Sequence, residues 1–327
     1  MFELDILGPL ALRAEGRPVW LRPMERVVLL ALYCAEGAAL SPQRLGALLW
    51  DRPGDRSPVT LRRHIAGTRK AAAGDVVVTR RQEAGSTSYS LGIGRDQIDA
   101  TRFQHQVADG CREYRHGRFG ESSWHLERAL QQWRGMPLAD AARRPFARAQ
   151  ITRLENAYRT AVITKLKADI SLGKHREATG ELKALVMVWP EDGEVWRLLV
   201  TCLYRSERPM EAARACRLAI QALRDQGLDD RPMRNLQHAA LAGTLPRHGL
   251  LPDGPVNGES TWATPPAPGA SEHVPYRLTG NQDDSAEIAL SLQAGRPCFR
   301  DTSGDVRIRV RSCCDTERES MTHCVTK

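Results

Sequence analysis

The chain has 327 residues, of which 42% are hydrophobic and 26% are charged, a balance typical of a globular protein with two domains. Its formal net charge of +8 suits a polyanionic partner but does not identify one. No stretch approaches the roughly 20 apolar residues of a membrane span, and the N-terminal segment lacks the basic start of a signal peptide. We therefore expect a cytoplasmic, nucleoid-associated protein without a membrane partner.

The eight cysteines form no CxxC pair of the kind that indicates a zinc or redox motif. Cys34, Cys202 and Cys216 fall inside apolar helical patterns, where a buried free thiol is the common state. The cysteines around Cys313 and Cys314 have a spacing that matches no zinc pattern. We expect no disulfide framework up to about residue 245, and no metal site and no cofactor in the chain.

The first 22 residues predict a small β-meander. Short alternating runs over residues 2–22 are interrupted at Gly8, Pro9 and Gly16, residue types that favour turns. From Met24 the hydrophobic period changes to that of a helix.

Three helices are predicted next. The first begins near Met24 and ends at Gly37. The second is capped by Ser41 with a proline in its first turn, and it extends to Trp50. After the turn DRPGDR, a second Ser-Pro pair opens a third helix over residues 58–73.

The third helix has one inward face, formed by Leu61, Ile65, Thr68 and Ala72. Its basic residues fall outside that face, on the predicted solvent side. Two strand patterns follow, DVVVTRR and TSYSLGI, joined by QEAGS. Strands, three helices and a terminal hairpin are the order of a winged helix-turn-helix, which we place at residues 1–95.

The side chains that we expect to contact DNA are Thr60, Arg62, Arg63, His64, Arg69, Lys70, Arg80 and Arg81. Arginine can bind guanine O6 and N7 with two hydrogen bonds, and the other side chains suit phosphates. The alternatives are a merely solvated basic helix face, a capping role for Thr60 and a solvated hairpin tip. Arg22 and Arg26 are weaker candidates for backbone contacts from the first helix.

Residues 98–245 are predicted to be helical throughout and to repeat. Pairs of residues 34 positions apart are Val162 and Trp196, Ala178 and Ala212, Leu182 and Cys216, and Leu185 and Ala219. This is the tetratricopeptide period, with a small residue where two helices cross closely. A weaker copy precedes these units, separated from them by the turn-rich segment WRGMPLADAARRP. The fold class is therefore mainly α with a small β component.

Four tryptophans lie at helical spacing in this array: Trp124, Trp133, Trp189 and Trp196. We interpret them as core residues and not as a ligand-stacking set. Residues 246–327 begin with a stretch rich in Pro, Gly and Ser and then lose periodicity, which predicts a linker and a poorly ordered tail.

Residues 1–245 resemble the Streptomyces antibiotic regulatory protein family, whose members combine an OmpR-type winged helix with a bacterial transcriptional activator domain. The segments that carry the resemblance are Ile6–Leu10, Glu25–Ala31, Leu45–Trp50, Thr60–Arg69, Tyr89–Leu91, Asp99–Phe103, Trp133–Asp140 and Leu203–Ser206. One departure is Gly67, because the family usually has no glycine there, and a glycine inside a helix costs about 1 kcal/mol relative to alanine. We therefore expect a less rigid third helix.

The resemblance implies a transcriptional activator of a secondary-metabolite gene cluster. It would bind promoter direct repeats as a homodimer, with half-sites about one helical turn apart, and contact RNA polymerase. The alternative is a protein-interaction scaffold in which the helical array is primary and the winged helix has lost DNA binding.

A third hypothesis is a nucleotide-dependent switch, because Val274–Gly280 resembles the approach to the NTPase domain of longer family members. It is opposed by the absence of a GxxxxGK[ST] phosphate loop. No HExxH, GxSxG or paired-acid pattern indicates catalysis either, so we expect a protein that is not an enzyme.

Overall fold

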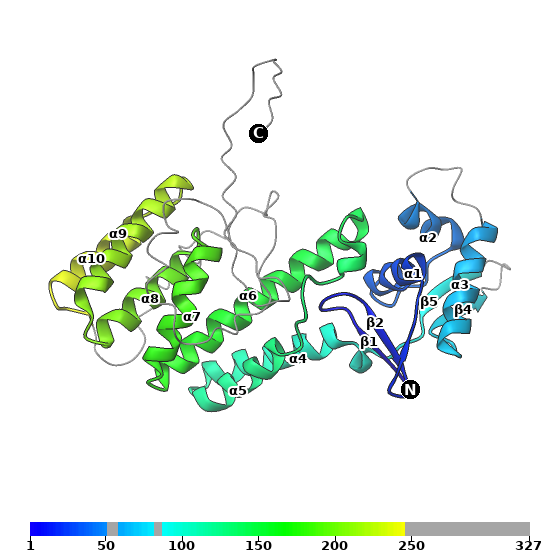
Figure 1. Cartoon of the computed structure of the whole chain (residues 1–327), viewed down its shortest axis with the longest axis horizontal. Coiled ribbons are helices and arrows are strands. Elements are labelled where there is room, and N and C mark those ends of the chain that lie inside the picture. Colours follow the sequence, from blue (N-terminus) through cyan, green and yellow to red (C-terminus); the bar gives the residue numbers. More distant parts are fainter. Residues whose placement is uncertain (51–57, 82–86, 246–327) are drawn as a thin grey trace, which may run out of the picture. The chain divides into compact units, whose positions relative to one another are not determined.

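The computed structural model describes residues 1–50, 58–81 and 87–245 (Figure 1). The predicted turn DRPGDR, the hairpin tip QEAGS, and the linker and tail with their cysteines lie outside the described residues. Within them the fold is mainly helical with two small sheets, as the sequence predicts.

The N-terminal sheet is a three-stranded antiparallel meander in the order β1-β2-β3, which confirms the sequence prediction. Its strands are β1 (Phe2–Asp5), β2 (Ala11–Ala14) and β3 (Arg17–Val19). Leu4 pairs with Leu12 in the register, and both side chains are buried. Between β2 and β3, Glu15 and Gly16 have φ values of 51° and 77°. Two consecutive positive φ angles are typical of a tight hairpin turn.

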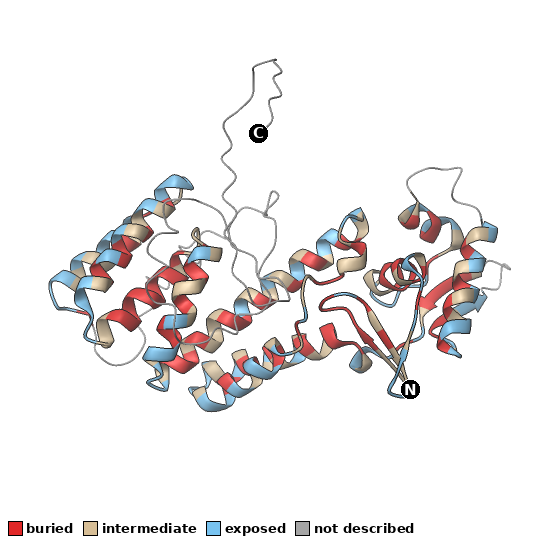
Figure 2. Ribbon diagram, viewed as in Figure 1, coloured by how far each residue is buried: buried red, intermediate tan, exposed pale blue. Residues whose placement is uncertain are grey.

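Three helices follow this sheet and pack against one another: α1 (Pro23–Cys34), α2 (Pro42–Leu49) and α3 (Pro58–Ala72). The Ser41 hydroxyl accepts a hydrogen bond from Arg44 N at 3.2 Å, so the predicted cap of α2 is confirmed. Leu61 and Ile65 of α3 are buried and share a core with α1 and α2 (Figure 2).

A two-stranded hairpin completes the first domain: β4 (Val77–Arg81) and β5 (Thr87–Leu91). Leu40, in the connection between α1 and α2, forms an antiparallel bridge with Tyr89 of β5. The hairpin is therefore held against the helices by backbone hydrogen bonds. Strands, three helices and a hairpin in this order form the predicted winged helix-turn-helix.

After the 3₁₀ turn η2 (Arg95–Gln97), helices follow one another. They are α4 (Asp99–Arg115), α5 (Phe119–Leu130), α6 (Arg148–Ser171), α7 (His175–Val188), α8 (Gly193–Arg205), α9 (Pro209–Asp225) and α10 (Arg231–Leu241). The starts of α7 and α9 are 34 residues apart, in agreement with the predicted period. Ala178 and Ala212 are buried at equivalent positions, where a larger side chain would separate the helices. The turn-rich insertion forms the 3₁₀ turns η3 (Ala139–Ala141) and η4 (Pro145–Ala147).

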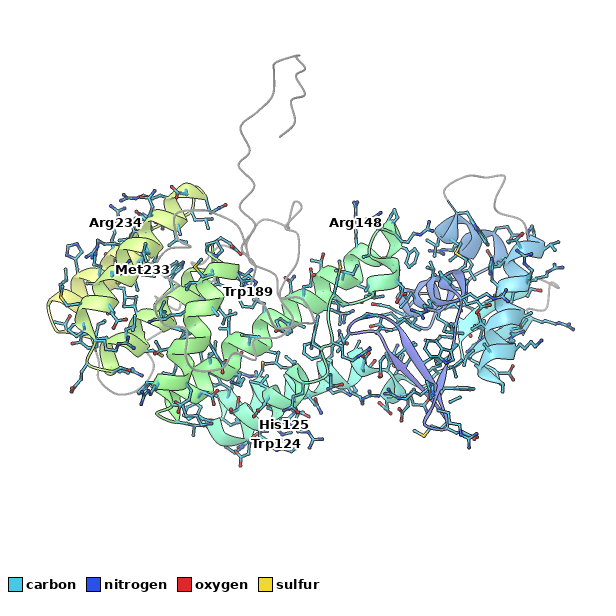
Figure 3. All side chains as sticks on the ribbon, viewed as in Figure 1. Trp124, His125, Arg148, Trp189, Met233 and Arg234 are labelled. Carbon is cyan, nitrogen blue, oxygen red and sulfur yellow. The ribbon has the colours of Figure 1, made fainter. Side chains whose placement is uncertain are left out.

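The tryptophan prediction is confirmed at three positions and wrong at the fourth. Trp133, Trp189 and Trp196 are buried in the helical core, whereas Trp124 is 53% exposed. Trp124 projects from α5 (Figure 3), with the Arg128 guanidinium 4.7 Å from its ring centroid. Helical spacing identified the apolar residue but not the side of α5 that faces solvent.

No helix within the described ranges is both long and apolar enough to cross a membrane. The four cysteines of these ranges are free, and two of them, Cys202 and Cys216, are fully buried.

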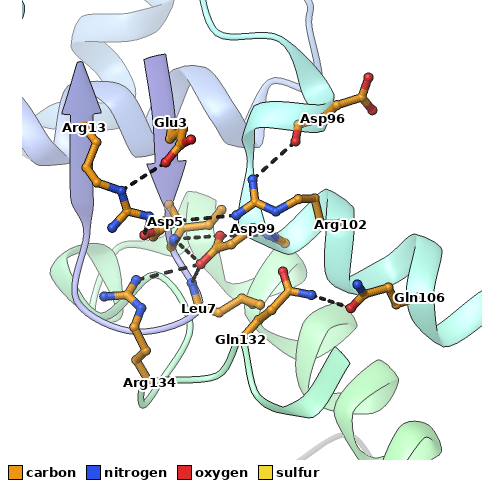
Figure 4. A network of polar contacts seen from close by, with 12 residues as sticks. Glu3, Asp5, Leu7, Arg13, Asp96, Asp99, Arg102, Gln106, Gln132 and Arg134 are labelled. Carbon is orange, nitrogen blue, oxygen red and sulfur yellow. Dashed lines mark hydrogen bonds and ion pairs between the residues drawn. The ribbon is translucent and has the colours of Figure 1, made fainter. Parts of the chain in front are cut away.

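The turn between β1 and β2 is bound by a carboxylate from the helical domain (Figure 4). Asp99, the first residue of α4, accepts hydrogen bonds from Ile6 N at 2.8 Å and Leu7 N at 3.0 Å. It also accepts one from Ala100 N at 2.7 Å, and the Arg134 guanidinium lies 3.8 Å away. Burial raises the pKa of Asp99 to about 6, and the three backbone donors oppose that rise.

A second carboxylate binds the other end of the same turn. Asp140 accepts a hydrogen bond from Leu10 N at 2.7 Å and pairs with Arg26 of α1 at 3.1 Å. The turn also accepts two backbone hydrogen bonds from the helical domain, from Arg134 N to Leu7 O and from Leu138 N to Ile6 O. We call residues 6–10 with Asp99, Arg134 and Asp140 the interdomain joint. It connects the winged helix to the helical domain mainly through backbone groups.

Replacing Asp99 with alanine should destabilise the whole protein. The change leaves the amides of Ile6 and Leu7 without acceptors, and each orphaned buried group costs about 1–3 kcal/mol. We expect the free energy of unfolding to fall by about 2–4 kcal/mol in urea titrations at pH 7. Asp96→Ala, three residues earlier and exposed, is the control and should change little. Equal stability of the two variants would contradict the role of Asp99.

The contribution of Asp99 should also depend on pH in a defined direction. Because its folded-state pKa is raised to about 6, the folded protein binds the proton more tightly than the unfolded chain. The unfolding free energy of the wild type, measured relative to Asp99→Asn, should therefore decrease as the pH rises from about 4 to 6 and stay constant above that. An increase over this range would contradict the assignment.

Candidate nucleic-acid interface

Helix α3 presents a basic stripe on the side away from its core. At 100° per residue, Arg63 and Lys70 point directly opposite the buried Leu61 and Ile65. Both basic side chains are exposed, as is Ala66 between them. No acidic residue occurs in α3. The stripe therefore combines positive charge with a small residue that lets the helix approach a flat or grooved surface closely.

Arg62 and Arg69 lie seven residues apart on the side of α3 that faces the hairpin. Arg62 is exposed. Arg69 is half-buried: its Nε and Nη2 donate to Val77 O at 2.8 and 2.6 Å, and its Nη2 also donates to Thr79 Oγ1 at 2.7 Å. The structure therefore places Arg69 as a brace between α3 and β4, and not on the solvent side that its spacing predicts. The hairpin carries Arg80 and Arg81, both exposed at the end of β4.

The opposite side of α3 carries Thr60 and His64, both half-buried. The His64 ring lies 6.3 Å from that of Trp50, which follows α2. Burial and the nearby charge of Arg63 lower the pKa of His64, so its imidazole is neutral at pH 7. Arg22, exposed before α1, lies close enough to contribute to the same shift. The sequence did not predict that Trp50 lies beside His64, because it indicated only that Trp50 ends the second helix.

Arg26 is not available on this surface. Its Nη1 pairs with Asp140 and its Nε donates to Leu21 O at 3.2 Å. The prediction that Arg26 could touch a DNA backbone is therefore replaced by a role in the interdomain joint.

Gly67 has a packing reason that the sequence did not reveal. A Cβ at this position would lie 2.3 Å from Oε1 of Glu25, a buried residue of α1. The other Glu25 oxygen accepts from Arg22 N at 2.9 Å and so caps α1. Gly67 thus lets α3 cross α1 closely over a buried carboxylate. This packing explains the glycine and replaces the sequence-based expectation of a less rigid third helix.

Alanine substitution should distinguish a glycine that is required for close helix packing, Gly67, from one that is not, Gly180. Gly180, in the middle of α7, has open space where a Cβ would be placed. Gly180→Ala should therefore stabilise the protein by about 1 kcal/mol through helix propensity. Gly67→Ala should lose that gain, because the new methyl group displaces Glu25 from its cap. Thermal unfolding of both variants provides the test, and equal stabilisation would contradict the close crossing.

No cluster of three or more His, Cys, Asp or Glu side chains that could hold a metal ion occurs in the part of the chain that the structure describes. The basic surface formed by Arg22, Arg62, Arg63, Lys70, Arg80 and Arg81, which we call the α3–wing surface, is the strongest candidate for a functional site.

Comparison with known proteins matches both domains. A family model described as "Bacterial transcriptional activator domain" matches residues 98–241. Transcriptional regulatory protein MoaR1 of Mycobacterium tuberculosis is 30% identical over 247 residues, which are 73% of this chain and 79% of MoaR1. Regulatory protein AfsR of Streptomyces coelicolor is 29% identical over 244 residues, 73% of this chain and 24% of AfsR.

Transcriptional regulatory protein EmbR of Mycobacterium tuberculosis is 29% identical over 234 residues, so this chain spans 60% of the length of that relative. The solved structure of EmbR in complex with a low affinity phosphopeptide superposes with a TM-score of 0.67 at 28% identity, covering 75% of this chain and 66% of that one. These similarities extend over the winged helix and the helical array together. The chain belongs to the Streptomyces antibiotic regulatory protein (AfsR-type) family of transcriptional regulators.

Proposed function

We propose that the chain binds double-stranded DNA in a sequence-specific manner and activates transcription. The observation that carries this proposal is the exposed basic stripe of α3, in which Arg63 and Lys70 flank Ala66. An α-helix fits the major groove of B-DNA, where each base pair presents a distinct pattern of donors and acceptors. The small side chain of Ala66 would allow the helix axis to approach the base edges.

The positions of the basic residues suggest a division of roles. Arg63 is the best candidate for a two-bond contact with guanine, because it lies at the centre of the outward face. Arg62, Lys70 and Arg22 suit phosphates on either side of the groove. Arg80 and Arg81 would reach the neighbouring phosphates from the hairpin. Arg69 would act indirectly, by holding the hairpin at a fixed position relative to α3.

The target genes, the arrangement of sites and the partner protein rest on the family. We infer that the regulated genes belong to a secondary-metabolite cluster, and that two copies of the chain occupy promoter direct repeats and contact RNA polymerase. Half-sites about one helical turn apart would place both copies on one side of the duplex. No enzymatic activity is part of this proposal.

One observation favours the alternative of an interaction scaffold. Trp124 and Arg128 form an exposed stacked pair on α5, and they line a shallow hollow with Glu127 and Gln131. An exposed tryptophan beside an arginine is a composition enriched at the centres of protein interfaces. This feature is compatible with DNA binding by α3, whereas Gly67 no longer supports a degenerate winged helix.

Gel-shift titrations with the promoter of a neighbouring gene should test the proposal. Arg63→Ala should weaken specific binding by about 1–3 kcal/mol and relax sequence preference at one base pair. Lys70→Ala should weaken binding to all sequences and reduce the salt slope by about 1. Arg69→Met should lower the unfolding free energy by about 1–2 kcal/mol, because it leaves Val77 O without its donor.

Arg176→Ala, which removes an exposed charge from α7, is the matched control and should leave binding unchanged. Unaltered DNA affinity in both Arg63→Ala and Lys70→Ala would rule out α3 as the recognition helix. Failure of sheared genomic DNA to compete at low salt would favour the scaffold instead.

A further inference from the structure

Four polar side chains meet where the start of α7 faces the end of α8: His175, Thr179, Cys202 and Arg205. The Thr179 hydroxyl donates to His175 O at 2.7 Å, and Thr179 is near enough to the Cys202 thiol to lower its pKa. Arg205 is close enough to affect the titration of both His175 and Cys202. We call these four residues the α7–α8 cluster. It lies in the helical array and contains no residue of the α3–wing surface.

Three nitrogen atoms of this cluster lack partners. Nε and Nη2 of Arg205 and Nδ1 of His175 are shielded from solvent and have no hydrogen-bond partner among the described residues. Nε and Nη2 share one edge of the guanidinium group, and that edge binds the two oxygens of a carboxylate side-on. Shielding charged donor atoms from water without a partner is costly even in a half-buried side chain, so an acceptor is expected at this edge.

Several other arginines of the same array have acidic partners. Arg208 donates to Glu211 at 2.6 Å, and Arg159 donates to Asp192 at 2.9 Å. The side chains that affect the pKa of Arg205 in the described chain are the Cys202 thiol and another arginine, Arg197, and neither is a carboxylate. Among the described residues, Arg205 is thus half-buried without an acidic partner, unlike Arg159 and Arg208.

The charge of the cluster indicates which anion it suits. Burial and the charge of Arg205 lower the pKa of His175, so the imidazole is neutral at pH 7. Burial also lowers the pKa of Arg205, but a guanidinium remains charged at neutral pH. The site thus carries one positive charge, which a single carboxylate group of a ligand neutralises.

We propose that the α7–α8 cluster binds a carboxylate, from an organic acid or a peptide, through Arg205 Nε and Nη2 with His175 Nδ1 as a third donor. His175 and Arg205 are only half-buried as whole residues, so the cluster lies at the surface of the array. A rotation of the Arg205 side chain would present its unpartnered edge to a ligand. The helical domain would then respond to a ligand that does not contact the DNA-binding helix.

Thermal unfolding of the full chain with added succinate, at constant ionic strength against chloride, tests the proposal. At ten times its Kd, one bound ligand should raise the Tm by about 3 °C. The shift should disappear in Arg205→Met and persist in Arg214→Met, which removes an exposed charge from α9. Without succinate, Arg205→Met should be as stable as the wild type or more stable, since an unpaired buried charge is removed.

A succinate shift retained in Arg205→Met, or no shift in the wild type, would overturn the site. Loss of stability in ligand-free Arg205→Met would overturn it too, because it would mean that Arg205 is structural. A larger shift with inorganic phosphate would overturn the carboxylate assignment.

If Arg205→Met does not fold, Arg205→Lys keeps the charge but removes the side-on edge and should lose the succinate response. NMR titration of His175 gives an independent readout. Bound carboxylate should raise the pKa of His175, because it offsets the charge of Arg205. An unchanged His175 pKa at saturating succinate would contradict the proposal.

Discussion

This structure depends on one constraint: the backbone groups of the turn between β1 and β2 find their hydrogen-bond partners in the helical domain. Backbone groups between β1 and β2 cannot bond to one another, because the turn separates the strands. Asp99 and Asp140 take the amides, and the backbone of Arg134 and Leu138 donates to the carbonyls. Since both carboxylates belong to the helical domain, the turn between β1 and β2 obtains these hydrogen-bond partners from that domain and not from the N-terminal sheet.

Local patterns in the sequence were sufficient for the elements and for most of the core. Period-2 runs predicted the meander and the hairpin, and the 34-residue repeat predicted that α7 and α9 occupy equivalent positions in successive units. Among the predicted contact residues, Arg62, Arg63, Lys70, Arg80 and Arg81 are exposed as expected. Whether they bind DNA remains a prediction that the gel shifts address.

The sequence could not predict where side chains meet partners distant in the chain. Arg69 and Arg26 look like outward basic residues by spacing, yet one braces β4 and the other pairs with Asp140. Gly67 looked like a helix breaker until the buried Glu25 appeared opposite it. Each correction comes from a contact between elements, which hydrophobic periodicity does not encode. Three of the eight segments that carry the family resemblance, Ile6–Leu10, Asp99–Phe103 and Trp133–Asp140, meet at the interdomain joint.

The joint recognises the turn through main-chain amides and carbonyls, which every residue type except proline provides. The hydrogen bonds to Asp99 and Asp140 therefore do not depend on the side chains of Ile6, Leu7 and Leu10, which are buried and must stay apolar and similar in volume to fit the core. Because the joint relies on backbone groups, chimeric proteins that combine domains of different regulators should be possible. A winged helix taken from another regulator should dock on this helical domain if its first turn keeps the same backbone path, so DNA specificity can be exchanged without redesigning the domain interface.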